Sequence, residues 1–388
     1  MRARHTAHST PSFPVYSAAF LSPTELVLGG GGGTSKTGIK NKLRLYHVDE
    51  FLTLKLANEL QLENGEDAPM SMAAHPDGSS FVCGINSSAE VVAKGENLNC
   101  RVYAVSDDDK IEFISSVGTL GKDDPEDFQK VTVFSPDGAY LVVAGCNELS
   151  MLTIPELVST HTRVDKGEIY DAAFSETTLV VATTLNLLVY SLLGSKKGKE
   201  KENAVLKLEN PTVIERPKLP GGDTGTFRVA KYHPHDSGIF YTAINTTPAR
   251  GAKASQRMAY LVRWNTDGWK VDRIRKVGVK GLTAFDLSDN GKWIAYGSSD
   301  CSVGLLDAFT LSPLLRILKS HEFPPTVLKF NPTSRLLVSG SADNTVRLIA
   351  IPEGLGDNAS WSYTITVIIA IFCVLFAVAL QLFMRGDI

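Results

Sequence analysis

The fold is decided by the stretch PTVLKFNPTSRLLVSGSADNTVRLIAI, which runs from Pro325 to Ile351. It contains an apolar run, a polar turn, a second apolar run that ends in small residues, a tight turn and a third apolar run. Short apolar runs separated by turn residues in this way predict antiparallel strands joined by hairpins. One such unit cannot bury both of its faces, so we expect it to pack between copies of itself.

The same order of runs and turns occurs six more times on the N-terminal side. The first strand of each copy ends at an aligned position, and the aligned residues are Phe20, His75, Phe134, Phe174, His233, Leu287 and Phe330. The turns HPDG, SPDG and SDNG have the Pro, Asp, Asn and Gly chemistry that closes hairpins. Copies of about 40 to 60 residues with several strands each predict an all-β chain, a seven-bladed β-propeller over residues 1–351.

The last copy lacks a fourth strand before the chain leaves the repeat. The segment Arg4–Ser9 precedes the first copy and is long enough to form a short strand. Because an open ring would leave two bare sheet edges, we expect this segment to pair with the last copy and close the ring.

Composition excludes several classes of function. The 388 residues carry a formal net charge of −3, which gives no reason to expect nucleic acid as a partner. The five cysteines are scattered and form no metal-ligand spacing with each other or with histidine, so we expect reduced thiols. We find no nucleophile elbow, no H-E-x-x-H sequence and no credible catalytic triad, so covalent chemistry is not expected.

One long apolar run lies near the C-terminus. TITVIIAIFCVLFAVALQLF covers Thr364–Phe383 and, at about 20 residues, has the length of one membrane-spanning helix. With the aromatic residues that precede it, this run predicts a transmembrane helix over 361–383, a linker over 352–360 and a short lumenal tail over 384–388. The basic N-terminus has no apolar core, so we expect no secretory signal and a propeller in the cytosol.

The most unusual segment is GGGGGTSKTGIKN, Gly29–Asn41, between the second and third strands of the first copy. It does not fit a phosphate-binding P-loop, because Ser35 stands where that motif needs its second glycine and a strand follows where a helix is needed. Two interpretations remain open. The glycines form a loose insertion, which loses much conformational entropy on ordering, or they permit a special backbone path in a loop that binds a partner.

This glycine-rich string, followed by the strand KLRLYHV, closely resembles the signature of the Sec-twelve/PREB family. These proteins are endoplasmic-reticulum membrane exchange factors for the Sar-type small GTPase that starts COPII vesicle coats. The resemblance extends to the plan of the chain, with seven divergent WD-like blades and a membrane helix directly after them. Copies six and seven are most similar to WD repeats, and Asp300 and Asp343 stand where those repeats use an aspartate to tie a tight turn.

The resemblance implies that the chain is a guanine-nucleotide exchange factor acting in transport from the endoplasmic reticulum to the Golgi. In that family the loop is held by a potassium ion and touches the GTPase. Carried over, the GTPase-contacting residues of the exchange loop are Ile39 and Gly38. The residues implied to hold potassium, mostly through backbone carbonyls, are Gly33, Thr34, Gly38 and Asn41.

Backbone carbonyls and an asparagine oxygen are suitable ligands for a monovalent cation. Ile39 has two open interpretations, as an exposed contact for the partner or as a side chain that packs inward on blade one. Four further residues are candidate partner contacts: Lys36, Thr37, Lys40 and Asn86. Asn86 is included because of its position in the neighbouring blade-two loop.

A second class of function stays open, a membrane-tethered propeller that only scaffolds other proteins. Scaffolding is a common function of WD-like propellers, and the fold alone does not exclude it. The glycine-rich loop is the feature that favours exchange over scaffolding, because a scaffold has no need of an ion-ordered loop that presents Ile39.

Overall fold

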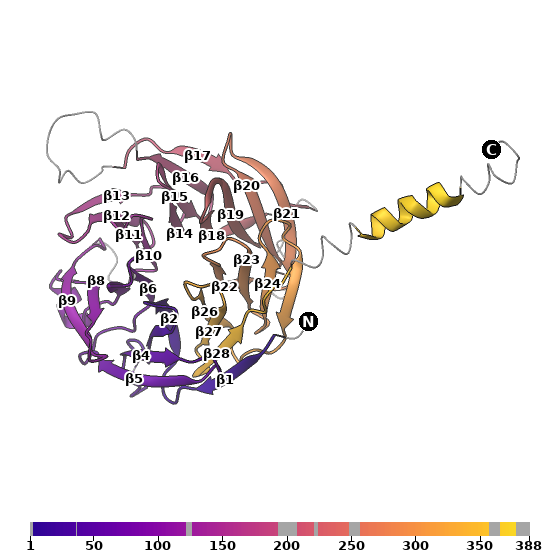
Figure 1. Ribbon diagram of the computed structural model, residues 1–388. Helices are drawn as coiled ribbons and strands as arrows, with labels where there is room; N and C mark the ends of the chain where they lie inside the picture. The colour runs from indigo at the N-terminus through magenta and orange to yellow at the C-terminus, as the bar shows by residue number, and fades with distance from the viewer. Residues whose placement is uncertain are drawn as a thin grey trace, which may run out of the picture. The chain divides into compact units, whose positions relative to one another are not determined.

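The computed structural model describes residues 3–35, 37–121, 126–192, 208–220, 224–247, 257–356 and 365–377. The chain divides into two units, Met1–Ala350 and Ile351–Ile388. In the described part of the first unit the strands form seven antiparallel sheets of four strands each. The sheets stand around a common axis as the blades of a propeller (Figure 1), which confirms the predicted seven-bladed β-propeller.

In blades one to six the strands follow the chain from the axis to the rim (Figure 1). Blades one and two contain β2 (Val15–Phe20), β3 (Glu25–Gly30), β4 (Lys42–Val48), β5 (Leu54–Gln61), β6 (Ser71–Ala74), β7 (Ser80–Gly84), β8 (Cys100–Val105) and β9 (Ile111–Val117), with helix α1 (Ala89–Ala93) between β7 and β8. Blades three and four contain β10 (Val131–Phe134), β11 (Tyr140–Ala144), β12 (Glu148–Thr153), β13 (Ser159–Arg163), β14 (Ile169–Phe174), β15 (Thr178–Thr183), β16 (Asn186–Ser191) and β17 (Thr212–Glu215).

Blades five and six contain β18 (Gly225–His233), β19 (Asp236–Thr246), β20 (Ala259–Asn265), β21 (Lys270–Gly278), β22 (Leu282–Leu287), β23 (Trp293–Ser298), β24 (Val303–Asp307) and β25 (Pro313–Ile317). Blade seven contains β26 (Pro325–Phe330), β27 (Leu336–Ser341) and β28 (Thr345–Ala350), and its fourth strand is β1 (His5–Ser9).

The ring is closed by the N-terminal strand, as the bare-edge argument predicts. β1 pairs antiparallel with β28, from His5 opposite Ile349 to Ser9 opposite Thr345. Asn344, in the turn before β28, adds to the closure because its backbone oxygen accepts from Thr10 N at 2.8 Å. Its side-chain oxygen accepts from Phe13 N, also at 2.8 Å.

The apolar core lies between neighbouring blades. At the closure, Phe13 and Val15 of the first blade pack against Val338 and Leu348 of the last, and all four are fully buried. Burying one such side chain stabilises the folded state by roughly 1.5–3 kcal/mol. Because each cluster needs residues from two blades, the ring holds together as one unit.

His75 and His233 pack between blades, as the repeat alignment predicts. The His75 ring meets the Phe134 ring edge-on at 5.2 Å between centroids. It also lies against Gly138 of the next blade, where an added Cβ would come within 2.3 Å of the His75 Nε2. His233 has the same relation to Gly291, where an added Cβ would come within 2.2 Å of Nε2. The glycines of these turns therefore make room for the neighbouring ring.

The two turn aspartates behave as the WD resemblance implies. Asp343 Oδ1 accepts from the backbone N of Thr345 at 2.9 Å and from its Oγ1 at 2.6 Å. Asp300 Oδ1 accepts in the same way from Ser302, at 3.1 Å and 2.5 Å. Each aspartate thus ties the turn between the second and third strands of its blade.

The second unit is described by itself. Residues 365–377 form a helix whose side chains are all exposed. Within the parts of the chain that the structure describes, we find no helix with the length and apolar character needed to span a membrane. The predicted segment 361–383 extends past this helix at both ends, and those ends, the second half of the linker and the tail 384–388 lie outside the described residues.

Candidate functional site

The glycine-rich loop lies where β3 ends and β4 begins in blade one. β3 contributes Gly29 and Gly30 to the sheet, and the loop proper starts at Gly31, whose N donates to the Pro14 carbonyl at 2.9 Å. Pro14 directly precedes β2, the innermost strand. The loop therefore projects from the face of the propeller at which the innermost strands begin.

The glycines of the loop are required by close packing. A Cβ on Gly30 would lie 2.1 Å from the Pro14 carbonyl oxygen. A Cβ on Gly31, which has a φ of +142°, would lie 2.3 Å from Asn41 Oδ1 and 2.5 Å from the Asn41 Cα. Both contacts are with backbone or with a hydrogen-bonded side chain, so neither neighbour is free to move away. This part of the string follows a defined path, which favours the second of the two interpretations.

Asn41 closes the loop on itself. Its Oδ1 accepts from Gly33 N at 2.8 Å, and its Nδ2 donates to the Gly33 carbonyl at 3.0 Å and to the Glu66 carbonyl at 2.7 Å. The Asn41 carbonyl in turn accepts from Leu62 N at 2.9 Å. Asn41 is only 8% exposed, so these hydrogen bonds are shielded from water. The loop is thereby joined to the connection between blades one and two.

That connection brings a carboxylate to the loop that the sequence did not single out. Asp67 Oδ1 lies 3.2 Å from the position a Cβ on Gly33 would take, and the carboxylate accepts from the backbone N of Thr34 and of Ala68. Burial raises the pKa of Asp67, and the two backbone hydrogen bonds oppose that rise. Among the described residues Asp67 has no ion-pair partner.

Ile39 and Gly38 lie at the outer end of the loop. Gly38 is exposed, has a φ of +79°, and has no atom within 4 Å of the position of an added Cβ. Ile39 is half-buried and belongs to neither the buried core nor the strongly exposed residues. Its Cβ lies 3.1 Å from where a Cβ on Gly32 would be, so the chain folds back over that glycine. Part of the Ile39 side chain thus remains open to a partner.

The remaining predicted contact residues differ in their surroundings. Lys40 is exposed, and its Nζ donates to Asn64 Oδ1 at 2.8 Å. Thr37 is exposed, and its Oγ1 lies 3.4 Å from the Ser35 hydroxyl. Lys36 lies outside the described residues. Asn86 is half-buried, with Nδ2 donating to the Asp127 carbonyl at 2.8 Å and Oδ1 accepting from Asn97 at 3.2 Å.

The structure brings Asn41 against Gly33, and it places the Asp67 carboxylate beside Gly33 and Thr34. Gly38 and Ile39 lie farther out on the same loop. Asn86 adjoins the group through its backbone, since its carbonyl accepts from Asp67 N at 3.0 Å. The acidic stretch ENGED at 63–67 was the available signal for Asp67, but nothing in the sequence places that stretch against a loop some 30 residues away.

Comparison with known proteins agrees with this fold. The family described as WD domain, G-beta repeat matches residues 312–349. The guanine nucleotide-exchange factor SEC12 of Candida glabrata is 26% identical over 93% of this chain and 76% of its own length. SEC12-like protein 2 of Arabidopsis thaliana is 24% identical over 83% of this chain and 75% of its own.

The putative guanine nucleotide-exchange factor SED4 of Candida glabrata is 25% identical over 90% of this chain. The match covers 32% of the length of that relative. The fold and the ordered loop define a WD-type propeller with one specialised inter-strand loop. Over most of its length the chain is similar to guanine nucleotide-exchange factors named SEC12, SED4 and SEC12-like.

Proposed function

We propose that this chain promotes GDP release from a Sar-type small GTPase at the endoplasmic reticulum and so starts the assembly of COPII vesicle coats. The observation that carries the proposal is the ordered path of the Gly29–Asn41 loop, held by Asn41 with Ile39 half-open at its outer end. Support also comes from the relatives that are named guanine nucleotide-exchange factors.

An exchange factor performs no covalent chemistry. It binds the nucleotide-free GTPase more tightly than the loaded form, because only a difference in affinity shifts the equilibrium. A loop with a fixed path is suited to this, since it meets the partner's switch segments without first losing conformational entropy. In our proposal Ile39 is the apolar contact, the open space around Gly38 admits the partner, and Lys36, Thr37 and Lys40 contribute polar contacts at the rim.

We also propose that the loop binds a potassium ion. The residues that would hold it are Gly33, Thr34 and Asn41, with Gly38 as a further carbonyl. The donor set fits, because each of these oxygens keeps a second lone pair beyond the hydrogen bonds it already accepts. Asp67 adds a partly buried negative charge beside Gly33, and burial of that charge is unfavourable unless a cation is near. When bound, the ion would supply positive charge that holds these oxygens together.

The membrane arrangement is part of the same proposal. Residues 361–383 would cross the endoplasmic-reticulum membrane once, with the propeller in the cytosol, the linker over 352–360 and the tail 384–388 in the lumen. The support is the apolar sequence of the segment and the helical conformation of its described part, 365–377. A tethered exchange factor would raise its own concentration at the membrane where the coat begins.

The deciding experiment is release of labelled GDP from a purified Sar-type GTPase, with and without the full chain in detergent. Catalysed release supports exchange activity. Stable binding of the GTPase without faster release would instead support the scaffold function. A GTPase of another family serves as the specificity control, and release from it at the same rate would contradict the Sar-type assignment.

A further inference from the structure

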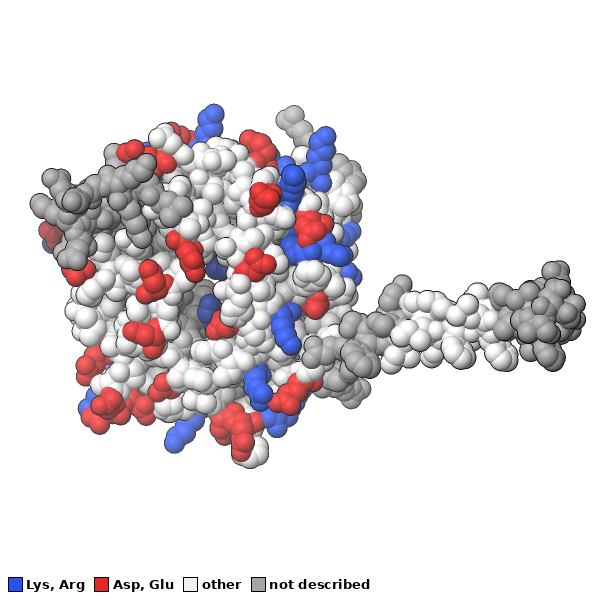
Figure 2. Space-filling view, turned by 45° about the horizontal axis from the view of Figure 1, so that its top comes forward, with Lys and Arg blue, Asp and Glu red and all other residues white. Residues whose placement is uncertain are grey.

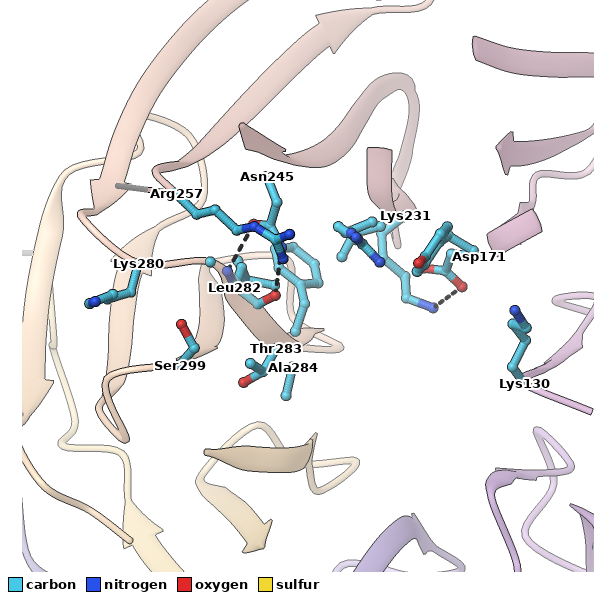
Figure 3. Close-up of a pocket in the computed structure, with 15 residues that line it drawn as sticks. Lys130, Asp171, Lys231, Asn245, Arg257, Lys280, Leu282, Thr283, Ala284 and Ser299 are labelled. Atoms are coloured by element: carbon cyan, nitrogen blue, oxygen red, sulfur yellow. Dashed lines mark hydrogen bonds and ion pairs between the residues drawn. The ribbon is translucent and has the colours of Figure 1, made fainter. Parts of the chain in front are cut away.

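A large pocket is lined by residues of blades three to six, well away from the glycine-rich loop along the ring. Its volume is about 880 Å³, and its wall includes Gly281 before β22, Ser299 after β23 and Arg257 before β20 (Figure 3). Ser299 N donates to the Gly281 carbonyl at 2.8 Å, just as Gly31 N donates to the Pro14 carbonyl at 2.9 Å. These are equivalent positions in blades six and one, so the pocket opens on the same face as the loop.

The pocket is strongly basic. One carboxylate, Asp171, is among the described residues that line it, against five cationic side chains, which are Lys130, Arg228, Lys231, Arg257 and Lys280. The lining charge is therefore five positive minus one negative, or four positive. Basic side chains are also visible in the central hollow of the propeller face shown in Figure 2, where the surrounding surface carries both signs of charge.

Two of the cations have carboxylate partners. Lys231 Nζ lies 3.8 Å from Asp171 Oδ1, and Figure 3 shows the two side chains pointing toward each other. Lys130 Nζ lies 2.5 Å from Glu168 Oε1. Asp171 is also committed to the scaffold, since it accepts from Ala172 N and from Ala230 N, both at 2.9 Å. Arg228, Arg257 and Lys280 line the pocket as well.

Arg228 is held in place by stacking on an aromatic ring. Its guanidinium carbon lies 3.9 Å from the centre of the Tyr170 ring, which also lines the pocket. Its Nε is the buried side-chain polar atom that has no hydrogen-bond partner in the described part of the chain. A buried donor without an acceptor costs about 1–3 kcal/mol. The stacked ring fixes the guanidinium before a ligand arrives, so the part of it that lines the pocket is already oriented for an anionic oxygen.

We propose that this pocket binds a compact anion with several phosphate groups, of the inositol polyphosphate kind, either free in solution or as the headgroup of a membrane lipid. The cations stand on the walls of a concavity and come from blade three, from blade five and from the connection to blade six, so a compact ligand charged on several sides meets more of them than an extended acidic peptide would. Arginine pairs with phosphate through two parallel hydrogen bonds, and the volume suits a small ligand. The proposal does not depend on exchange activity.

The test is calorimetric titration of the full chain in detergent with inositol hexakisphosphate. The double variant R257Q/K280Q removes two wall charges, and the matched control K270Q/K276Q removes two exposed charges from the outer strand β21 of blade five. We expect one saturable site whose dissociation constant rises at least about tenfold in R257Q/K280Q, and less than about twofold in the control. No binding by the wild type, or equal weakening by both pairs, would overturn the proposal.

A second set of measurements separates the possible ligands. R228K keeps the positive charge but removes the planar guanidinium that stacks on Tyr170, so we expect weaker binding with an unchanged melting temperature. An oligoglutamate peptide of equal charge that competes as strongly as the inositol phosphate would overturn the proposal in favour of a peptide site. Reconstitution in vesicles with a polyphosphoinositide identifies the source of the ligand. If the protein in these vesicles binds inositol hexakisphosphate more weakly, the lipid headgroup occupies the pocket. If the affinity is unchanged, the ligand is a soluble one. Either result supports a polyphosphate-binding pocket.

Discussion

The side-chain amide of Asn41 hydrogen-bonds the backbone of Gly33 in both directions. Its Oδ1 accepts from the Gly33 N at 2.8 Å, and its Nδ2 donates to the Gly33 carbonyl at 3.0 Å. The eight-residue separation between the two makes a closed loop, and the outer end of that loop carries Gly38 and Ile39. One amide group therefore determines the path of the segment on which the proposed function depends.

The first prediction tests this amide. Asn41→Ala removes three shielded hydrogen bonds and leaves the Glu66 carbonyl without its donor, which costs about 1–3 kcal/mol. We expect faster amide hydrogen exchange at Gly33 and GDP release slowed at least about tenfold, with the propeller still folded. Asn64→Ala is the control, because Asn64 is exposed and bonds only the Lys40 side chain in this region. Unchanged amide exchange at Gly33 would contradict the role of Asn41.

The second prediction concerns the cation and Asp67. Burial raises the pKa of this carboxyl, so the folded state favours its protonated form, and the ionised form lowers stability at pH values above the folded pKa. A bound cation would offset that loss. At neutral pH and constant ionic strength we expect the melting temperature to rise when a large organic cation is replaced by potassium.

In Asp67→Asn the same replacement should raise the melting temperature less than in the wild type, because the loop oxygens remain but the variant has no buried charge to offset. Asp108→Asn provides the control, since the Asp108 side chain is 82% exposed and lies in the turn before β9. The cation hypothesis fails if the wild type melts at the same temperature in both salts.

The sequence predicts the fold well because propeller blades are built from local patterns. Strand periodicity and turn chemistry locate every inner strand, and the cost of a bare edge locates β1 beside β28. The candidate site is harder to predict from the sequence, because its residues come together only when the blades pack against each other. Asp67 reaches the loop through a connection between blades, and Arg228 meets Tyr170 across blades five and four. Topology alone places Asn86 beside the loop, but it does not predict the hydrogen bonds that the Asn86 side chain forms with Asp127 and Asn97.

The third prediction concerns acid stability and His321. The ring is buried beside Ser339, Thr345 and Asp343, with Nε2 2.8 Å from the Ser339 Oγ and Nδ1 2.7 Å from the Thr345 Oγ1. Burial lowers the pKa of His321 from 6.5 to about 4, and the neighbouring Asp343 carboxylate only partly opposes this. Between these two values the unfolded chain binds a proton that the folded chain does not, so stability falls as pH falls from 6.5 to 4.

The loss from this one group approaches about 3 kcal/mol at the acid end of that range. The lowered pKa of Asp343 acts in the same direction, because its carboxylate loses its folded-state hydrogen bonds when it is protonated. Urea unfolding at a series of pH values should show a shallower slope in His321→Gln than in the wild type. His47→Gln is the control, at a half-exposed histidine of blade one, and an equal slope in wild type and His321→Gln would refute the assignment.

The fourth prediction concerns the second unit. Deleting residues 361–388 should leave a folded propeller, because the contacts that close the ring lie within Met1–Ala350. We expect the same melting temperature for residues 1–360 as for the full chain, recovery without detergent, and exchange on a GTPase free in solution. A melting temperature several degrees lower would mean that the second unit contributes to the propeller.

The last prediction separates the two interpretations of Ile39. This side chain is half-buried on the loop, outside the core clusters between blades, so Ile39→Ala opens no cavity of the kind that costs about 2–5 kcal/mol. If it contacts the GTPase, the substitution removes apolar area that matters only in the complex. A central apolar contact of this kind contributes about 2 kcal/mol or more, so GDP release should slow at least about tenfold while the melting temperature stays the same.

The control is Leu56→Ala, which removes an apolar side chain that is 47% exposed on β5 of the same blade and should change neither quantity. Normal exchange by Ile39→Ala would exclude the contact. Loss of both stability and exchange would support inward packing instead, because the side chain would then stabilise the loop through its packing over Gly32. Binding of the nucleotide-free GTPase distinguishes these outcomes further, since a partner contact predicts weaker binding with an unchanged loop structure, measured as amide exchange at Gly33.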